Sequence, residues 1–285
     1  MSRMAVGPTL PSPAVLREED IPHAARAAEL VVETHRIIGP ALRAGMTLAQ
    51  IDRLVAQTLD RFQVVSAFLH YSTSRYPAFP SYACLSVNDV VVHGTAGMST
   101  TPLQRGDVIS IDIGVRYKGW NGDAAWTYII EEASEESRRL CECGIEALRR
   151  GVEQLQPGYP LLRWAQAVQQ CVEKEYGYHC VERLGGHGLG CGRDHLHDPP
   201  HLANAVPPYP GDWPDSQFRL APGMLLAVEP IIAVGTSKVI QRPRQWPIRT
   251  ADGSLSVHYE HDVLITERGP RLLTAGLEDL PMIVG

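Results

Sequence analysis

Five side chains of types that bind divalent metal ions stand out in this chain of 285 residues. They are four carboxylates and one imidazole: Asp112, Asp123, His187, Glu229 and Glu260. This mixture of donors suits hard or borderline ions such as Mn, Fe(II), Co or Zn. Four carboxylates are too many for one ion but suit two, and two ions about 3.5–4 Å apart can activate a water and hold a reacting carbonyl. The set therefore predicts a two-metal hydrolytic site.

Two of the five residues follow similar apolar stretches, one in each half of the chain. Residues 106–112 (GDVISID) and 223–229 (GMLLAVE) both read Gly, two residues, an aliphatic, a small residue, an aliphatic and a carboxylate. Burying a carboxylate at the end of an apolar strand is costly unless a partner compensates for its lost hydration. We expect Asp112 and Glu229 each to end a strand and to share that partner.

Asp123 follows a turn-rich connector, residues 118–122. If the connector is a hairpin, Asp123 faces Asp112 across paired strands, an arrangement of like charges that favours a cation between them. The alternative is an ordinary turn residue. Glu229 is followed by Pro230, which removes a ladder hydrogen bond and marks an edge or bulge where a side chain is re-aimed.

His187 lies among the glycines of residues 185–190 (GGHGLG), which leave its ring unobstructed and let other backbone approach closely. A histidine taken alone is more often an ordinary loop residue, but this one supplies the nitrogen ligand that the four carboxylates lack. Glu260 lies in a stretch whose alternation places Tyr259 and His261 on the opposite face of a strand.

Two helical segments followed by strand-like segments occur twice along the chain. Helical periodicity is found from Ile21 to Ile38, after Thr47 as an N-cap, from Ser134 to Leu155 and from Leu161 to Tyr176. Residues 45–55 also resemble residues 158–168. We expect an α+β fold, a single domain of residues 18–285 after a loose leader of residues 1–17. Its two related halves, about 18–131 and 132–285, would close around one site.

The composition limits the class of protein. The net charge is −6, which argues against a nucleic-acid-binding protein. No run reaches the 18 apolar residues of a membrane span, and the first residues lack the features of a secretory signal. We therefore expect a cytoplasmic protein with no membrane contact. Free thiols are then expected for the six cysteines: Cys84, Cys141, Cys143, Cys171, Cys180 and Cys191.

Five short motifs resemble those of one enzyme family. They are residues 88–94 (NDVVVHG), 106–112 with 121–123 (NGD), 186–190 (GHGLG), 222–230 (PGMLLAVEP) and 259–261 (YEH). Together they resemble the type I methionine aminopeptidases of the pita-bread metallopeptidase family, over about residues 21–274. The resemblance implies a pita-bread fold of helices on a curved antiparallel sheet. It also implies a monomeric cytoplasmic enzyme, with the ribosome as a further partner. Such an enzyme removes the initiator methionine from peptides and nascent chains when the next residue is small.

The resemblance also implies a role for each metal-binding residue. Asp112 would chelate one of two divalent ions (Co, Mn, Fe(II) or Zn). His187 and Glu229 would hold the other ion, and Asp123 and Glu260 would bridge both. Glu229 would in addition carry protons during catalysis.

Two histidines correspond to catalytic, substrate-contacting positions of the family. His93 is the first. The second follows the Gly-His-Gly segment and precedes an acidic residue and a proline, which His197 fits. Its spacing from His187 is ten residues where the family pattern has seven, so His195 competes with it, and we favour His197.

The methionine pocket of the family is lined by aromatic residues and a cysteine. Tyr76, Phe79, Cys84 and Trp246 correspond to those positions, with Phe79 where a tyrosine is common. Flat aromatic walls and a polarisable sulfur suit a methionine side chain. Core packing is the other interpretation for each of them.

Three alternatives stay open. A relative that cleaves X-Pro bonds would share the five ligands, although the short chain and the region of Cys84 argue against it. A metal-free binding module of the same fold is disfavoured because all five ligands are present. A specialised aminopeptidase is the third, since residues 190–220 are rich in proline and lack periodicity. We expect that segment to be a long loop at the rim of the cleft.

Overall fold

The computed structural model describes residues 15–285, except for the side chains of Arg193 and Pro210. Within this range the long helices are α1 (Ile21–Ile38), α2 (Leu48–Arg61), α3 (Glu135–Glu153) and α4 (Leu162–Gln169). A π-helical segment, η2 (Gln170–Tyr176), continues α4. All of these helices lie where the helical periodicity predicts them.

Side-chain caps fix the starts of two helices. Thr47 Oγ1 accepts a hydrogen bond from the Gln50 N–H (3.3 Å), and Gln50 Oε1 accepts one from the Thr47 N–H (2.8 Å). This reciprocal pair is a capping box. At α3, Ser134 Oγ accepts from the Ser137 N–H at 3.0 Å. Both starts agree with the sequence prediction.

The first half is built on a long antiparallel hairpin, β4 (Val108–Tyr117) and β5 (Trp120–Ile130). Lys118 and Gly119 form its turn, and both have positive φ, as a tight strand reversal requires. The hairpin belongs to a sheet of order β1-β4-β5-β16 in which β2 also pairs with β4. The other strands of this sheet are β1 (Val65–Ser66), β2 (Cys84–Val87) and β16 (Ile283–Val284).

The second half is built on a sheet of order β15-β14-β9-β7-β8. Its strands are β7 (Gly185–Gly188), β8 (Asp198–Ala203), β9 (Leu225–Val228), β14 (His261–Thr266) and β15 (Gly269–Leu272).

Two smaller sheets have the orders β13-β10-β6 and β11-β12-β3. Their strands are β3 (Val90–Val92), β6 (His179–Cys180), β10 (Ile231–Ala233), β11 (Val239–Gln241), β12 (Ile248–Thr250) and β13 (Ser256–His258). Short 3-10 helices complete the described chain: η1 (Gly39–Ala41), η3 (Arg193–His195), η4 (Pro210–Asp212), η5 (Pro214–Gln217) and η6 (Ala275–Leu277).

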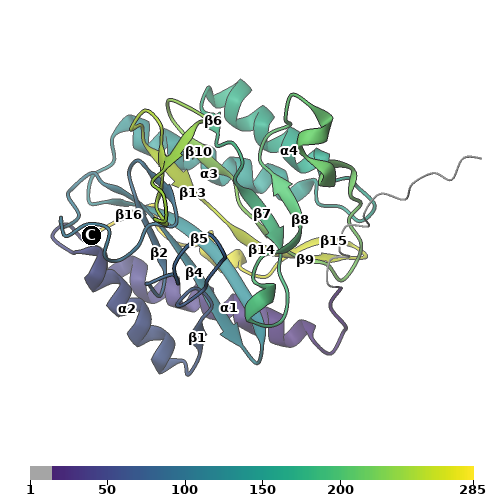
Figure 1. Ribbon diagram of the computed structural model, residues 1–285, viewed down its shortest axis with the longest axis horizontal. Coiled ribbons are helices and arrows are strands. Elements are labelled where there is room, and N and C mark those ends of the chain that lie inside the picture. Colours follow the sequence, from purple (N-terminus) through teal and green to yellow (C-terminus); the bar gives the residue numbers. More distant parts are fainter. Residues whose placement is uncertain (1–14) are drawn as a thin grey trace, which may run out of the picture.

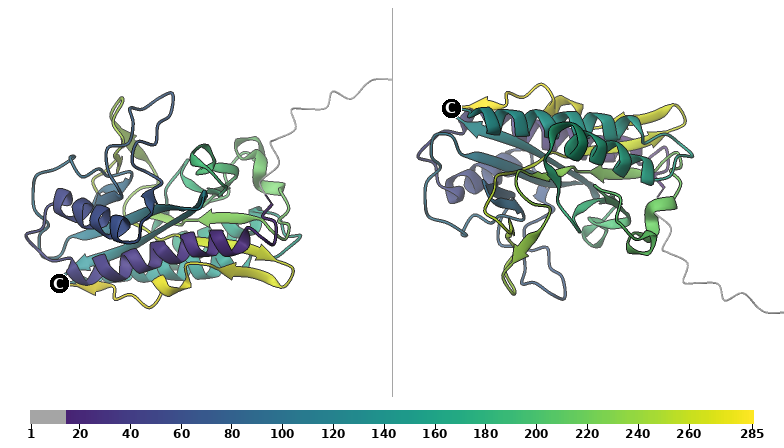
Figure 2. Two further views of the ribbon diagram at one scale, coloured as in Figure 1. Left: turned by 90° about the horizontal axis from the view of Figure 1, so that it is seen from below. Right: turned by 90° about the horizontal axis from the view of Figure 1, so that it is seen from above.

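Figure 1 shows α1 and α2 in the lower part of the view and α3 and α4 in the upper part. Figure 2 shows α1 and α3 along one side, with the loops around β11 and β12 projecting on the other. The contact of α1 with the hairpin is close, because a Cβ at Gly122 of β5 would lie 2.5 Å from the carbonyl carbon of Ala27. The helical layer therefore leaves the opposite side of the sheets for the site.

The expected repeat is present in the backbone. Gly45 and Gly158 both have positive φ, of 87° and 83°. Their N–H groups donate to Leu103 O (2.8 Å) and Leu220 O (2.7 Å), respectively. The resemblance between residues 45–55 and 158–168 therefore reflects two similarly built halves.

The predicted leader, residues 1–17, lies mostly outside the described residues. Its last part already contacts the fold, since Val15 forms an isolated bridge with Met224 and the Leu16 N–H donates to Gly223 O at 2.8 Å.

All six cysteines are free, as expected, and only Cys191 is exposed. Within residues 15–285 no helix is long and apolar enough to cross a membrane.

Candidate metal centre and substrate cleft

The β4–β5 hairpin positions the first two carboxylates. Asp112 pairs with Ala125, and Gly114 pairs with Asp123, so the two aspartates are diagonal neighbours on one face of the hairpin. The predicted position of Asp112 at a strand end is wrong, because β4 continues through it for five more residues. The turn-residue alternative for Asp123 is also wrong, because it lies within β5, whose pairing with β4 extends beyond it. The pairing of the strands is what brings these two carboxylates together.

The β7 and β9 strands position His187 and Glu229. His187 pairs with Ala227, and Glu229 directly follows β9 as expected. Glycines next to His187 allow the close approach of its neighbouring strands: a Cβ at Gly186 would lie 2.3 Å from Ala227 O, and one at Gly188 2.2 Å from a carbonyl of β8. His187 Nε2 then lies 3.8 Å from Glu229 Oε1.

Glu260 joins the two halves. It lies between β13 and β14, and its N–H donates to Ala125 O of the hairpin at 2.9 Å. Tyr259 and His261 do not line the cleft and pack instead against the ring of Trp126, Tyr259 edge-to-face and His261 tilted, with centroids 4.8 and 5.8 Å away. The alternation predicted around Glu260 is therefore present, although two strands rather than one supply it.

The carboxylates form a strongly anionic, buried cluster. Burial raises the pKa of Asp123 and Glu260 well above the ordinary range, and the neighbouring carboxylates raise both further. Burial also raises the pKa of Asp112, to about 6. Among the described residues, Asp112 Oδ1, Asp123 Oδ1 and His258 Nε2 are buried atoms without a hydrogen-bond partner. Buried polar atoms are normally paired, so these open positions fit bound cations.

The donor atoms are close enough to hold ions. Three groups of three residues in the described part of the chain have donor atoms within 4.8 Å of one another: Asp112, His258 and Glu260; His187, Glu229 and Glu260; Asp123, His187 and His197. Every one of the five predicted metal-binding residues belongs to at least one group. Glu260 and His187 each belong to two groups, and of these only the carboxylate of Glu260 has two oxygen atoms with which to bind two ions.

Two members of the cluster were missed in the sequence. His258 Nε2 lies 2.9 Å from Glu229 Oε2 and 3.6 Å from Glu260 Oε2, and its side chain is 4% exposed. Asp262 Oδ2 accepts a hydrogen bond from the Asp123 N–H at 3.0 Å. The sequence could have indicated both residues. Each lies two positions from Glu260 in an alternating stretch, and residues two apart on a strand face the same side.

A cleft of about 320 Å³ opens above the cluster and contains all the predicted site residues. The predicted residues are the five expected metal ligands with His93, His197, Tyr76, Phe79, Cys84 and Trp246. His258, Tyr71 and His201 also line the cleft, although the sequence did not indicate them.

Aromatic rings form one wall of this cleft. Trp246 lies 5.0 Å from Tyr76, 5.3 Å from Phe79 and 5.9 Å from His93, measured between ring centroids. Cys84 is the strand neighbour of Asp112, so its sulfur lies where the aromatic wall meets the carboxylates. Apolar surface therefore adjoins the candidate metal centre directly.

The structure distinguishes the two competing histidines. The ring of His197 lies 4.4 Å from that of His187 between centroids, and Tyr71 Oη lies 3.0 Å from His197 Nδ1. His195 does not line the cleft; its side chain is 59% exposed and pairs with Asp198 at 3.1 Å. The geometry therefore favours His197, as the motif did.

The segment 190–220 is a rim, but the expectation that it is one long loop is wrong. It contains strand β8, which pairs with β7, and short helices. Asn121 of the hairpin holds the start of the segment, because its Nδ2 donates to Gly190 O and Gly192 O, both at 2.9 Å. Strand β8 was not indicated by the sequence, because proline cannot donate a backbone hydrogen bond and this stretch is rich in it.

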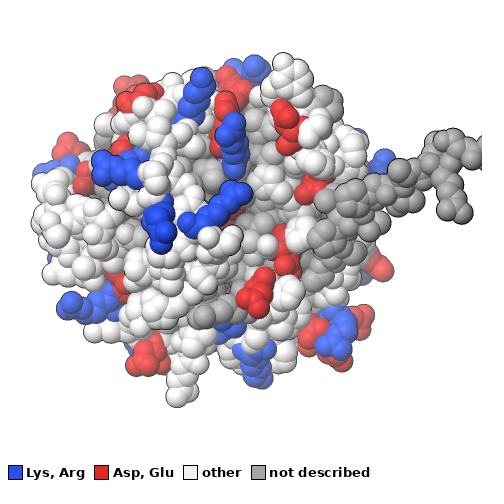
Figure 3. Space-filling model, viewed as in Figure 1, with Lys and Arg blue, Asp and Glu red and all other residues white. Residues whose placement is uncertain are grey.

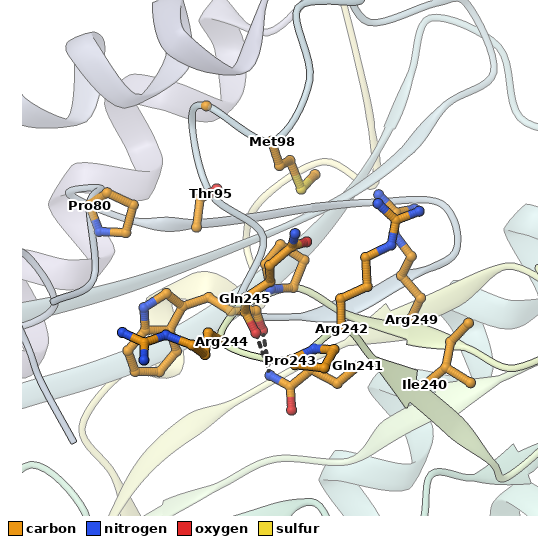
Figure 4. A pocket seen from close by; sticks show the side chains of 13 residues that line it. Pro80, Thr95, Met98, Ile240, Gln241, Arg242, Pro243, Arg244, Gln245 and Arg249 are labelled. Carbon is orange, nitrogen blue, oxygen red and sulfur yellow. Dashed lines mark hydrogen bonds between the residues drawn. The ribbon is translucent and has the colours of Figure 1, made fainter. Parts of the chain in front are cut away.

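A second hollow of about 760 Å³ adjoins the cleft and shares Trp246 and Gln241 with it (Figure 4). Arg242, Arg244 and Arg249 line this hollow, and Figure 3 shows basic side chains gathered on the same face of the molecule. Gln241 Nε2 donates to Gln245 O and Trp246 O, at 2.9 and 3.0 Å, which holds the loop that separates the two spaces.

Comparison with known proteins identifies the family. The model of metallopeptidase family M24 matches residues 18–267. Methionine aminopeptidase from Aquifex aeolicus is 34% identical over 261 residues, which cover 90% of this chain and 96% of the relative. The crystal structure of methionine aminopeptidase from Thermotoga maritima superposes with a TM-score of 0.82 at 30% identity, covering 92% of this chain and 99% of that one.

More distant structures share the fold alone. The X-Pro aminopeptidase from Thermotoga maritima has a TM-score of 0.71 at 22% identity, and this chain spans 64% of its length. The expected pita-bread fold is therefore confirmed, and the chain belongs to metallopeptidase family M24, in the group of the methionine aminopeptidases.

Proposed function

We propose that this protein is a metal-dependent aminopeptidase that releases N-terminal methionine from peptides and nascent chains with a small second residue. One observation carries the proposal: two groups of metal-binding side chains share Glu260 and lie directly beside an aromatic pocket in the same cleft. The relatives named methionine aminopeptidase support the same activity.

The proposed ligands are those expected from the sequence. Asp112 would hold one divalent ion, His187 and Glu229 the other, and Asp123 and Glu260 would bridge them. The burial and the raised pKa values of Asp123 and Glu260 support this role, since a cation relieves both their desolvation and their mutual repulsion. Bound ions would lower the pKa of a water and polarise the scissile carbonyl.

Proton transfer is assigned to Glu229. Its carboxylate lies at the base of the cleft beside His187 and His258. It would take a proton from the attacking water and pass that proton to the leaving amine. Such transfer contributes roughly 10²–10⁴-fold to rate.

The two cleft histidines would contact the substrate. Burial lowers the pKa of His93 to about 4, so its ring is neutral at pH 7 and hydrogen-bonds without carrying charge. His197, oriented by Tyr71, would stabilise the oxyanion that forms at the scissile carbonyl.

Tyr76, Phe79, Cys84 and Trp246 would bind the methionine side chain. The Trp246 ring is fixed, because its Nε1 donates to Pro77 O at 2.9 Å and Tyr76 stacks on it. A rigid aromatic wall loses little entropy when an apolar side chain binds.

The test is a panel of peptides assayed with Mn, Fe(II), Co and Zn. Met-Ala and Met-Gly peptides should lose methionine, and X-Pro peptides should stay intact. Cleavage of X-Pro peptides or of other N-termini, with none of Met-Ala, would replace the assignment by one of the rival peptidases. A protein that binds no divalent ion would support a binding module instead.

A second test separates catalysis from metal binding. Glu229→Gln should lower kcat by about 10²–10⁴-fold in protein that still contains metal. Near-normal turnover of this variant would contradict the role of Glu229. The monomeric state and contact with the ribosome stay predictions, which sedimentation of the protein alone and with ribosomes would test. The cytoplasmic location also stays a prediction, which fractionation of cells would test.

A further inference from the structure

The two halves share a hydrogen-bond pattern that relates their residues one by one. The Gly106 N–H donates to Ile130 O at 2.8 Å, and the Gly223 N–H donates to Ile265 O at the same distance. Both glycines have nearly equal positive φ, 89° and 90°. The two halves can therefore be aligned residue by residue. Gly106 matches Gly223, and Ile130 matches Ile265. The residues after each glycine and those before each isoleucine are then matched without gaps.

This alignment pairs His258 with Asp123. Asp123 lies seven residues before Ile130, and His258 lies seven residues before Ile265. The second half thus places an imidazole where the first half places a carboxylate proposed to bind metal.

The backbones of these two residues are held in corresponding ways. The Asp123 N–H donates to Asp262 Oδ2 at 3.0 Å. Thr127 Oγ1 donates to His258 O at 2.8 Å. Thr127 lies four residues after Asp123, and Asp262 lies four residues after His258, so these two residues match each other in the alignment and each half uses the same position to hold the other.

The side chain of His258 is in place to bind an ion. Its Nε2 is buried, lies 2.9 Å from Glu229 Oε2 and 3.6 Å from Glu260 Oε2, and meets the geometry of a hydrogen bond with none of the described residues. Nε2 also belongs to the donor group of Asp112 and Glu260, whose members lie within 4.8 Å of one another. A buried nitrogen that lies close to several carboxylates and lacks a well-formed hydrogen bond to any of them suits a metal ligand.

We propose that His258 is a metal ligand that completes the site of the ion held by Asp112. This inference rests on the proposed metallopeptidase function and adds one donor to it. Each ion then has one imidazole, His187 on one and His258 on the other. Four carboxylates balance the charge of two divalent ions, and a neutral sixth donor keeps that balance. Two imidazoles favour borderline ions such as Zn, Fe(II) and Co over Mg or Ca.

The experiment compares metal binding by four proteins: the wild type, His258→Ala, His258→Gln and, as a control, His201→Ala. His201 also lines the cleft but belongs to no donor group. The proteins are stripped of metal and titrated with Co(II), followed by visible absorption and calorimetry. X-ray absorption of the loaded forms counts the imidazoles for each ion, and far-ultraviolet circular dichroism checks the folding of each variant.

The wild type should bind two ions with an average of one imidazole for each. Loss of an outer partner of a metal ligand costs about 10–100-fold in affinity. Loss of His258 as a ligand should therefore weaken the binding of one ion by roughly 100-fold or more. With enough Co(II) to load both sites, the average imidazole count for each ion should fall by half. Gln at position 258 keeps a polar side chain but has no imidazole, so it should give the same reduced count. His201→Ala should match the wild type.

Two results would overturn the inference. One is an unchanged imidazole count and affinity in both His258 variants. The other is a fall in turnover without any change in metal binding, which would make His258 a positioning residue for Glu229. A wild type that binds no ion would instead contradict the proposed function itself.

Discussion

Replacing Asp112 by asparagine should have opposite effects on the metal-free and the metal-loaded protein. Asp112 is buried, and its pKa is raised from 3.8 to about 6, first by burial and then by the neighbouring Glu229 carboxylate. One pKa step corresponds to about 1.4 kcal/mol. Keeping Asp112 ionised in the folded, metal-free protein therefore costs on the order of 3 kcal/mol above pH 7.

The sign of the pH dependence follows from the direction of the shift. The folded protein has the higher pKa, so the contribution of Asp112 to stability is complete below about pH 4 and is lost as the pH rises through about 6. Asp112→Asn removes this loss. The metal-free variant should match the wild type near pH 4 and exceed its free energy of unfolding by up to about 3 kcal/mol at pH 7.5.

Urea unfolding of metal-stripped protein, followed by tryptophan fluorescence between pH 4.5 and 8, measures the difference. Asp60→Asn, which changes an exposed carboxylate of α2, is the matched control and should show no such trend. With Mn(II) present the order should reverse, because Asp112→Asn removes a ligand. A metal-free variant no more stable than the wild type at pH 7.5, or a difference that does not change with pH, would refute the reasoning.

Three further predictions concern the cleft and its frame. His197→Ala should lower kcat/KM by about 10²-fold or more if it stabilises the oxyanion, whereas His195→Ala, outside the cleft, should leave steady-state rates near those of the wild type. Trp246→Ala should raise KM for Met-Ala peptides more than it lowers kcat, because it removes a wall of the pocket; an effect on kcat alone would contradict that role. Gly186→Ala should lower the thermal midpoint, with a destabilisation of about 1–3 kcal/mol or more, because its Cβ would lie 2.3 Å from Ala227 O; an unchanged midpoint would show that β7 and β9 can separate freely.

Local signals in the sequence were sufficient to predict the helices and to single out five side chains that the structure brings into one cluster. Thr47 and Ser134 cap helices through neighbours three residues away, so the signal and the structure lie within one turn. The echo between residues 106–112 and 223–229 was also local. It predicted two similar halves because each copy encodes the same glycine turn and strand.

The strand boundaries were less predictable. Asp112 was expected at the end of a strand, because a carboxylate after an apolar run interrupts the pattern. In the structure β4 continues past it, since the hairpin partner β5 supplies hydrogen bonds along its whole length. Likewise, β8 forms in a proline-rich segment because β7 lies beside it. In both cases the neighbouring strand outweighs the local preference of the residues.

The sequence by itself determined the family, the related halves and which side chains could bind metal, since these depend on residue identity over short spacings. The tertiary structure decided which groups meet. It brings His197 rather than His195 into the cleft, and it places His258 beside Glu229. Such contacts join residues far apart in the chain, as the hydrogen bond from the Asp123 N–H to Asp262 does. Spacing along the chain does not encode them, because they depend on how the two halves pack together.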